Sequence, residues 1–204
     1  MPELPDRQVL DQINQQCYDA CYNNWDRFPF PHTLPDWIHR YHPHKDQAYA
    51  LDIGSGTGRL ALWLQEHSFR VLCLDPSKQM VKICESKGLH CIQTTFQEFS
   101  GEDNSFSLIV SCLSLIHIPK EEWPTQLEKM HRLLKPKGVL ILACLEGQDQ
   151  HIQKESSGFS RFFAYTSSNE LCALLKPHFK LLNFLRESGS PAYILFAFQK
   201  KDLI

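Results

Sequence analysis

LDIGSGTGRL, residues 51–60, is the stretch of sequence that decides the fold. It ends a compact apolar run at 48–53, which is typical of a buried strand, and Leu60, Trp63 and Leu64 then recur at helical spacing. Glycines let a chain turn sharply and let a ligand approach the backbone closely. A helix N-terminus adds unbonded N–H groups and a partial positive charge. The stretch therefore predicts a strand, a ligand-binding turn and a helix.

The glycine spacing separates two kinds of ligand. A dinucleotide site favours Gly-x-Gly-x-x-Gly, with a pyrophosphate on the helix N-terminus. This loop reads Gly-x-Gly-x-Gly, and Asp52 stands two residues before its first glycine. A carboxylate there would repel a pyrophosphate and suits a ligand that carries an ammonium group. An NAD or flavin site, or a purely structural turn, is the alternative.

A second acidic residue follows the next predicted strand, 70–74. Asp75 can accept hydrogen bonds from both hydroxyls of a ribose. The alternative is a capping or turn role, because Pro76 and Ser77 could begin the next helix by themselves.

Strands and helices alternate from residue 48 onward, which predicts a doubly wound α/β sheet. The run 139–145 is almost wholly apolar, as a central parallel strand should be. Further on, 151–160 is polar and predicts a loop, and 179–184 and 192–198 predict an antiparallel edge hairpin. The remaining predicted elements are strands at 48–53, 70–74, 90–93 and 106–112, and helices around 60–64, 80–84, 123–134 and 171–175.

Composition predicts one globular domain over residues 1–204. It would comprise an N-terminal helical and aromatic cap at 1–45, a ligand-binding core at 46–147, and an acceptor-side loop and hairpin at 148–204. In the cap, Leu10, Ile13 and Cys17 predict a short helix, and 28–31 interrupts regular structure.

The net charge of −2 gives no reason to expect nucleic acid as a partner. No apolar run is long enough to span a membrane, and the first residues lack a signal-peptide pattern, so we expect a cytoplasmic monomer or homodimer. The eight cysteines include no CxxC pair and are expected to be reduced core residues. No metal site is expected from His32, His39, His42 and His44, since no further ligands complete a set.

The chain resembles the small, single-domain class I S-adenosylmethionine-dependent methyltransferases. Residues 52–58 match that family's first motif, and Asp75 matches its ribose-binding acid. Residues 106–110 resemble its fourth strand, and 133–140 resemble the lead into its fifth. The resemblance covers about 48–145 and implies a Rossmann-like seven-stranded sheet, mostly parallel with an antiparallel last strand. It also implies methyl transfer from S-adenosylmethionine.

The resemblance implies donor contacts at the ends of successive strands and from the N-terminal helix. Thr95 stands where the family often has an acid near the adenine, so Gln97 or a backbone carbonyl is the alternative contact. Ser107 and Lys137 also depart from the family pattern. The implied donor-binding residues are Asp52, Gly54, Ser55, Gly56, Thr57, Gly58, Asp75, Pro76, Ser77, Met80, Thr95, Phe96, Gln97, Ser111, Cys112, Leu113 and Tyr18.

The acceptor end has weaker signals. His117, just past the fourth strand, is the candidate general base, and a structural histidine is the alternative. Tyr22 and Trp25 are candidate substrate contacts, or simply pack an amphipathic helix. Arg161 with Tyr165 could hold a carboxylate acceptor, or could belong to a strand edge packed with core aromatics.

We expect a small-molecule acceptor with an O, N or S nucleophile. The segment after the fourth strand, 111–114, lacks the Asn/Asp-Pro-Pro-Tyr pattern of enzymes that methylate base or amide nitrogens. A methyltransferase acting on protein or RNA is the second hypothesis. A non-catalytic S-adenosylmethionine-binding protein is the third.

Overall fold

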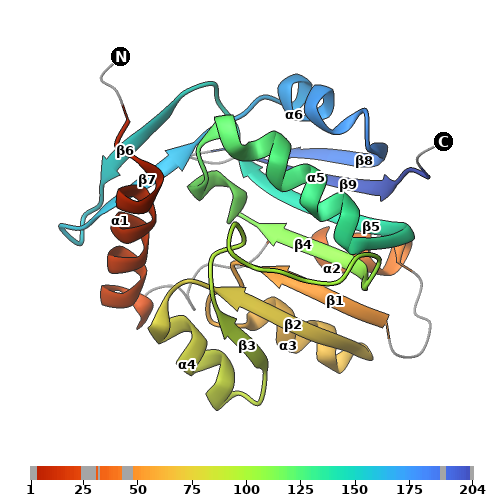
Figure 1. Cartoon of the computed structure of the whole chain (residues 1–204), viewed down its shortest axis with the longest axis horizontal. Coiled ribbons are helices and arrows are strands. Elements are labelled where there is room, and N and C mark those ends of the chain that lie inside the picture. Colours follow the sequence, from red (N-terminus) through yellow and green to blue (C-terminus); the bar gives the residue numbers. More distant parts are fainter. Residues whose placement is uncertain (1–3, 24–30, 32, 43–47, 189–191, 203–204) are drawn as a thin grey trace.

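The computed structural model describes residues 4–23, 31, 33–42, 48–188 and 192–202 (Figure 1). It places these residues in a central sheet with helices on both faces and with the N-terminal helix across the carboxyl ends of the parallel strands. Among the described helices, none has the length and apolarity that a membrane span requires.

The central sheet has seven strands in the order β3-β2-β1-β4-β5-β9-β8, which confirms the predicted fold class. Neighbouring strands from β3 to β5 are parallel, whereas β9 runs antiparallel to both β5 and β8. From β1 the successive strands are added toward one edge of the sheet, and from β4 they are added toward the other edge. In open α/β sheets, ligands bind in the crevice at such a switch point. The bounds are β1 Ala48–Ile53, β2 Phe69–Asp75, β3 His90–Gln93, β4 Phe106–Cys112, β5 Leu134–Leu145, β8 Phe179–Glu187 and β9 Tyr193–Lys200.

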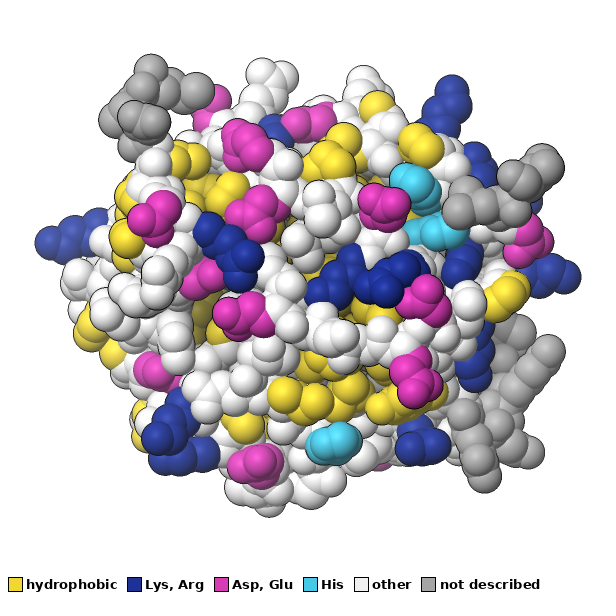
Figure 2. Space-filling view, viewed as in Figure 1, with side chains coloured by type: hydrophobic (Ala, Val, Ile, Leu, Met, Phe, Trp, Pro, Cys, Tyr) yellow, Lys and Arg dark blue, Asp and Glu magenta, His cyan; other side chains and the backbone are white. Residues whose placement is uncertain are grey.

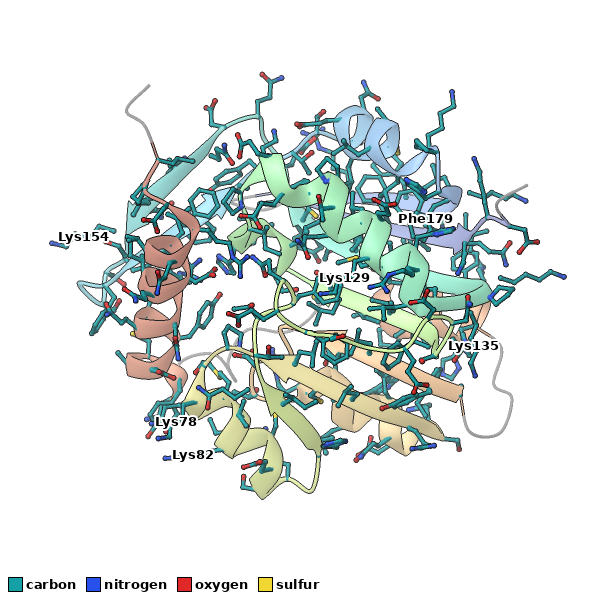
Figure 3. The ribbon with its side chains drawn as sticks, in the orientation of Figure 1. Lys78, Lys82, Lys129, Lys135, Lys154 and Phe179 are labelled. Carbon is teal, nitrogen blue, oxygen red and sulfur yellow. The ribbon has the colours of Figure 1, made fainter. Side chains whose placement is uncertain are left out.

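Two hydrophobic clusters, one on each face, bury the sheet. One contains apolar side chains of α1, α5 and α6, and the other contains those of α2, α3 and α4. In the first cluster Phe179 lies against Phe198 and against His131 of α5 (Figure 3). The helices are α1 Arg7–Ala20, α2 Thr33–Tyr41, α3 Arg59–Glu66, α4 Lys78–Ser86, α5 Trp123–Leu133 and α6 Ser168–Leu175.

The N-terminal cap contains more regular structure than the sequence predicts. Helix α1 buries Leu10 and Cys17 as expected, and its N-cap Asp6 accepts a hydrogen bond from the Val9 amide. Helix α2 was not anticipated, and it buries Leu34 and Trp37 against the sheet. The predicted interruption at 28–31 falls largely outside the described residues.

The predicted loop at 151–160 is wrong in its first half. Residues Gln150–Lys154 form strand β6, which pairs antiparallel with β7, Ser160–Ala164. Most of β6 is exposed, so it shows no apolar periodicity, and its backbone pairing with β7 holds it in place. Phe162 and Phe163 of β7 are buried and anchor this hairpin to the body of the protein.

The glycine loop between β1 and α3 depends on left-handed backbone. Gly54 has a φ of 68°, and a Cβ there would lie 2.4 Å from the Cβ of Ser114. Gly56 has a φ of 56°, but a Cβ there would meet no described heavy atom within 4 Å. The loop is therefore packed against protein at Gly54 and opens onto free space at Gly56.

This contrast predicts different stabilities for two matched variants. Gly56→Ala should cost about 1–2 kcal/mol, the cost of a left-handed residue with a side chain. Gly54→Ala should cost roughly 1–3 kcal/mol more because of the clash with Ser114. Thermal unfolding should show the difference, at about 2–4 °C for each kcal/mol. Equal melting temperatures would contradict the close packing at Gly54.

Candidate functional site

A cavity of about 650 Å³ lies at the carboxyl ends of the parallel strands. The arrowheads of β1, β2 and β4 point toward α1 in Figure 1, and α1 and the β6–β7 hairpin form the outer side of the cavity. Donor-side and acceptor-side residues predicted from sequence thus share one cavity.

Asp52 is the most unusual acid of this cavity. It is 2% exposed, and its Oδ2 has no hydrogen-bond partner among the described residues. Burial, with Cys84 and Asp75 nearby, raises the pKa of Asp52 to about 8. Such a carboxyl is stabilised either by a proton or by a cation from a ligand.

Asp75 is also buried, but the backbone satisfies it. Its Oδ2 accepts from the Gly56 amide at 2.8 Å, and its Oδ1 accepts from the Ser77 amide at 2.9 Å. Burial raises the pKa of Asp75 to about 7 although both hydrogen bonds oppose the rise. Each carboxylate oxygen has a second lone pair with which to accept a ligand hydroxyl.

Three predicted donor contacts do not line the cavity, and two of them are serines that hold its walls. The Ser77 hydroxyl caps α4 at the Met80 amide and donates to Asp19 of α1 at 2.6 Å. Ser111 is fully buried and hydrogen-bonds the Ser114 hydroxyl, which in turn donates to the Ile53 carbonyl.

Gly58 is the third. It precedes α3 and packs against Leu89 and Cys84. Leu113, by contrast, lines the cavity with a φ of 60°, a left-handed backbone that is uncommon for a non-glycine residue.

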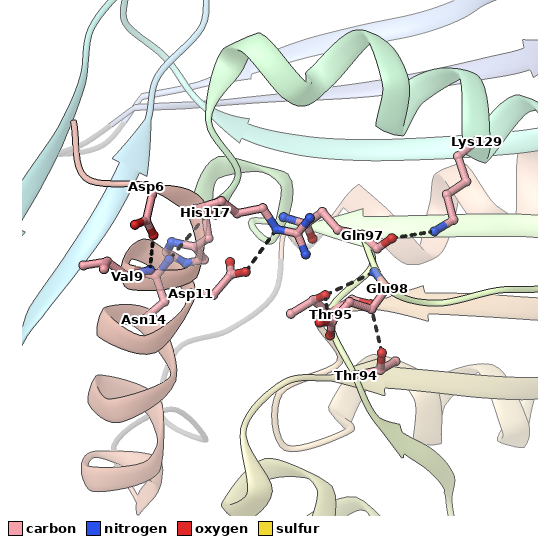
Figure 4. A network of polar contacts seen from close by, with 11 residues as sticks. Asp6, Val9, Asp11, Asn14, Thr94, Thr95, Gln97, Glu98, His117 and Lys129 are labelled. Carbon is pink, nitrogen blue, oxygen red and sulfur yellow. Dashed lines mark hydrogen bonds and ion pairs between the residues drawn. The ribbon is translucent and has the colours of Figure 1, made fainter. Parts of the chain in front are cut away.

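The β3–β4 loop forms another part of the wall (Figure 4). The Thr95 hydroxyl donates to Glu98 and accepts from the Glu98 amide, so it stabilises a turn. Lys129 of α5 donates to the carbonyls of Phe96 and Gln97 at 2.6 and 3.3 Å. Figure 3 shows this lysine over the body of the molecule, whereas the other lysines labelled there lie at the periphery.

Tyr18 of α1 and His117 form a half-buried pair on the side of the cavity that borders β7. The Tyr18 hydroxyl lies 2.7 Å from Nε2 of His117, and Nδ1 of His117 lies 2.7 Å from the Phe162 carbonyl. Burial lowers the pKa of His117 to about 4 and raises the pKa of Tyr18. His117 is therefore a neutral imidazole near pH 7, and both its nitrogens have protein partners.

Arg161 of β7 joins this pair to a carboxylate. Its Nη1 donates to the Tyr18 hydroxyl at 3.2 Å, and its Nε and Nη2 both donate to Glu155 Oε1, at 3.2 and 2.8 Å. Burial opposes the charge of Arg161, but Tyr18 and Glu155 raise its pKa. Tyr165 lines the cavity beside this group and stacks on His151.

Asn14 connects three elements and was not among the residues predicted from sequence. Asn14 Oδ1 accepts from the Phe162 amide at 2.8 Å, and its Nδ2 donates to the His117 carbonyl at 3.4 Å (Figure 4). A polar residue at a buried helix position was the available signal, but its partners lie on β7 and after β4.

The cavity brings together most of the predicted residues. Tyr22 does not line it, and Trp25, His32 and His44 fall outside the described residues. Among the described residues, no cluster of His, Cys, Asp or Glu is arranged to hold a metal ion. The predicted residues that line the cavity are Tyr18, Asp52, Gly54, Ser55, Gly56, Thr57, Asp75, Pro76, Met80, Thr95, Phe96, Gln97, Cys112, Leu113, His117, Arg161 and Tyr165.

The chain is similar in sequence and in fold to known methyltransferases. Residues 50–138 match the methyltransferase domain family. A provisionally named methyltransferase of Bacillus subtilis, YqeM, is 27% identical over 129 residues, covering 60% of this chain and 48% of that protein. The demethylmenaquinone methyltransferase of Oceanobacillus iheyensis is 28% identical over 150 residues, covering 69% of this chain and 61% of that protein. The chain thus spans about half to two thirds of the length of these relatives.

Among solved structures, the 1,6-didemethyltoxoflavin-N1-methyltransferase of Burkholderia thailandensis has the same fold. The TM-score is 0.80 at 19% sequence identity, with 99% of this chain and 93% of that chain covered. That crystal contains 1,6-didemethyltoxoflavin and S-adenosylhomocysteine. Residues 50–138 of the present chain are thus similar to the methyltransferase domain, within a sheet that has the fold of the Burkholderia enzyme.

Proposed function

We propose that the protein binds S-adenosylmethionine in this cavity and transfers its methyl group to a small molecule. The observation that carries the proposal is the buried Asp52 carboxyl, which lines the cavity without a described partner for Oδ2. S-adenosylmethionine carries an ammonium group that would satisfy it. Asp75 can accept the ribose hydroxyls, and Gly56 leaves room for close approach.

The donor supplies a methyl group that its sulfonium already activates, so the protein's task is to align the acceptor and exclude water. Helix α1 and the β6–β7 hairpin are placed for this second task, because both border the cavity. Asp19 attaches α1 to the start of α4, and Asn14 attaches it to β7.

A small acceptor fits the acceptor end better than a macromolecule does. Ile116, Phe163 and Tyr165 give this end a largely apolar wall. Over the face shown in Figure 2, Lys and Arg side chains are interspersed with Asp and Glu, and no broad basic area is present. The Burkholderia enzyme, whose crystal holds a small heteroaromatic compound, supports the same class of acceptor. The eight described thiols are all free, which supports a cytoplasmic location.

Calorimetric titration tests the donor. S-adenosylmethionine and S-adenosylhomocysteine should each bind with one site per chain, whereas NAD should not, because its pyrophosphate would face Asp52. Binding of NAD alone would overturn the proposal, and so would failure of both sulfur ligands to bind.

Asp75→Asn should weaken S-adenosylhomocysteine binding about tenfold or more, because charge-assisted hydrogen bonds are stronger than neutral ones. Asp103→Asn is the matched control: it removes the same charge from an exposed pair with Arg132. Calorimetry should show a change only in the first variant, with folding verified by thermal unfolding. Unchanged affinity in folded Asp75→Asn would remove Asp75 from the binding site.

The Asp52→Asn variant tests whether the ammonium group of the donor approaches this carboxyl. An ammonium ligand would lower the pKa of Asp52 from about 8, so wild-type protein should release about one more proton per donor at pH 7 than the variant does. Calorimetry in buffers of different ionisation enthalpy measures this release. Equal release by the two proteins would mean that no cation approaches Asp52.

The same variant has a stability consequence. In the free protein the folded-state pKa of Asp52, about 8, exceeds the ordinary value of 3.8, so its contribution to stability is lost as pH rises between these values. Free Asp52→Asn, which cannot ionise there, should lose less stability than the wild type from pH 5 to 8 in denaturant titrations. Parallel stability curves would contradict the raised pKa.

A further inference from the structure

The hydrogen bonds around His117 have fixed directions. The Phe162 carbonyl can only accept, so Nδ1 of His117 carries the proton. A neutral imidazole then has its lone pair on Nε2, which means that the Tyr18 hydroxyl donates to Nε2. Because the phenol proton points at His117, Tyr18 can meet a ligand only with its oxygen, as a hydrogen-bond acceptor.

The charges at this end of the cavity cancel. The Arg161 guanidinium faces Glu155 at 2.8 Å, and both side chains are largely buried, with exposures of 12% and 23%. Asp11 of α1, which also borders the cavity, pairs with Arg7. Each of these two pairs is neutral in sum, in contrast to Asp52 at the donor end. Arg59, the other arginine of the cavity wall, stands at the start of α3, directly after the glycine loop.

The apolar part of the wall favours a flat molecule. Phe163 of β7 and Tyr165, which follows β7, border the cavity, and Arg161 covers the Phe163 ring at 4.6 Å. Ile116 and Ile118, next to His117, add aliphatic surface. Aromatic and aliphatic side chains of this kind bind planar rings through dispersion and desolvation.

We propose that the acceptor is a small, uncharged, planar molecule that donates an O–H or ring N–H hydrogen bond to Tyr18, and that Tyr18 passes its own proton to His117 during methyl transfer. This inference rests on the proposed function. It makes Tyr18 a catalytic residue of the acceptor end, and it makes His117 the residue that positions Tyr18 and receives its proton.

The step balances in atoms and charge. The lone pair of the acceptor atom forms the bond to the methyl carbon, and the electron pair of the broken C–S bond stays on sulfur. The acceptor's proton moves to the Tyr18 oxygen, and the Tyr18 proton moves to Nε2 of His117. Tyr18 ends as a neutral phenol, and His117 ends as a cation with Phe162 and Tyr18 accepting from its two N–H groups. The positive charge lost at sulfur thus appears on His117.

The pKa of His117, about 4, sets the timing of this transfer. A base that weak does not ionise a free phenol or lactam. It does take a proton from the much more acidic cation that forms when such a group gains a methyl group, so the proton leaves late. The groups that face this imidazole are Tyr18 from α1, Arg161 and Phe163 from β7, and Glu155 through Arg161.

The test uses sets of three planar probes on protein saturated with S-adenosylhomocysteine. One set is 7-hydroxycoumarin, its methyl ether and its 3-carboxylate. The other is 2-quinolone, its N-methyl derivative and its 4-carboxylate. Calorimetry should show each neutral N–H or O–H parent binding about fivefold or more tightly than either analogue, since the parent alone offers an uncharged donor to Tyr18. In the Tyr18→Phe variant the parent should bind no more tightly than its methylated analogue.

Turnover of any parent that yields S-adenosylhomocysteine tests the proton transfer. His117→Gln can still accept from the Tyr18 hydroxyl but cannot hold a proton, so kcat should fall roughly 100-fold or more while donor affinity stays within about threefold. Tyr49→Phe is the control, because it also removes a phenol hydroxyl. The Tyr49 ring packs against Phe106 and does not line the cavity, so this variant should keep the wild-type kcat.

The outcomes distinguish the two proposals. If S-adenosylhomocysteine binds but no neutral parent does, or if the carboxylates or methylated analogues bind as well as the parents, the acceptor class is wrong and the proposed function stands. If His117→Gln keeps full kcat, the proton does not go to His117. If S-adenosylhomocysteine itself fails to bind, the proposed function and this inference both fail.

Discussion

The Asp75 carboxylate, held between the backbone amides of Gly56 and Ser77, is the interaction on which the site depends. It joins the end of β2, the glycine loop and the start of α4 at one buried point. Two hydrogen bonds to an acid in the interior offset part of the cost of removing water from around it. The left-handed backbone at Gly54 and Gly56 permits this arrangement, because it lets the loop present its amide inward.

The two acids of the donor end show how burial serves different purposes. Asp75 has its partners within the chain, so it organises the loop before any ligand arrives. Asp52 has an oxygen without a described partner, which makes the free protein less stable than a fully satisfied core would be. A ligand that brings a cation to Asp52 removes the free-energy cost of the unpartnered oxygen, and the binding free energy becomes more favourable by the same amount. The cavity therefore combines one acid whose hydrogen bonds are satisfied within the chain with one acid whose Oδ2 has no described partner.

Much of the fold was predictable because its signals are local. Strands β1, β3 and β4 have the predicted bounds, and Asp75 stands at the end of β2 because an apolar run simply stops there. Strand β6 was missed since its side chains are polar and exposed, so only its pairing with β7 defines it. Helix α2 carries an amphipathic pattern that its proline-rich surroundings obscured.

The site was less predictable where contacts join distant parts of the chain. The glycine loop and Asp75 could be recognised from spacing, and both line the cavity. Ser77 and Ser111 stand at strand ends like their neighbours, but their hydroxyls turn toward α1 and Ser114. His117 looked available as a base, yet its partners come from α1 and β7. No local pattern could reveal these pairings.

The β6–β7 hairpin contributes no strand to the seven-stranded sheet, yet it supplies Glu155, Arg161, Phe163 and Tyr165 to the cavity. The residues of the donor end instead follow β1, β2 and β3, which the sheet fixes. Under the proposed function, recognition of the two reactants is divided between the sheet and a hairpin that lies outside it. If that function holds, exchanging the hairpin for another of equal length is a route to new acceptors that leaves the proposed donor site unchanged.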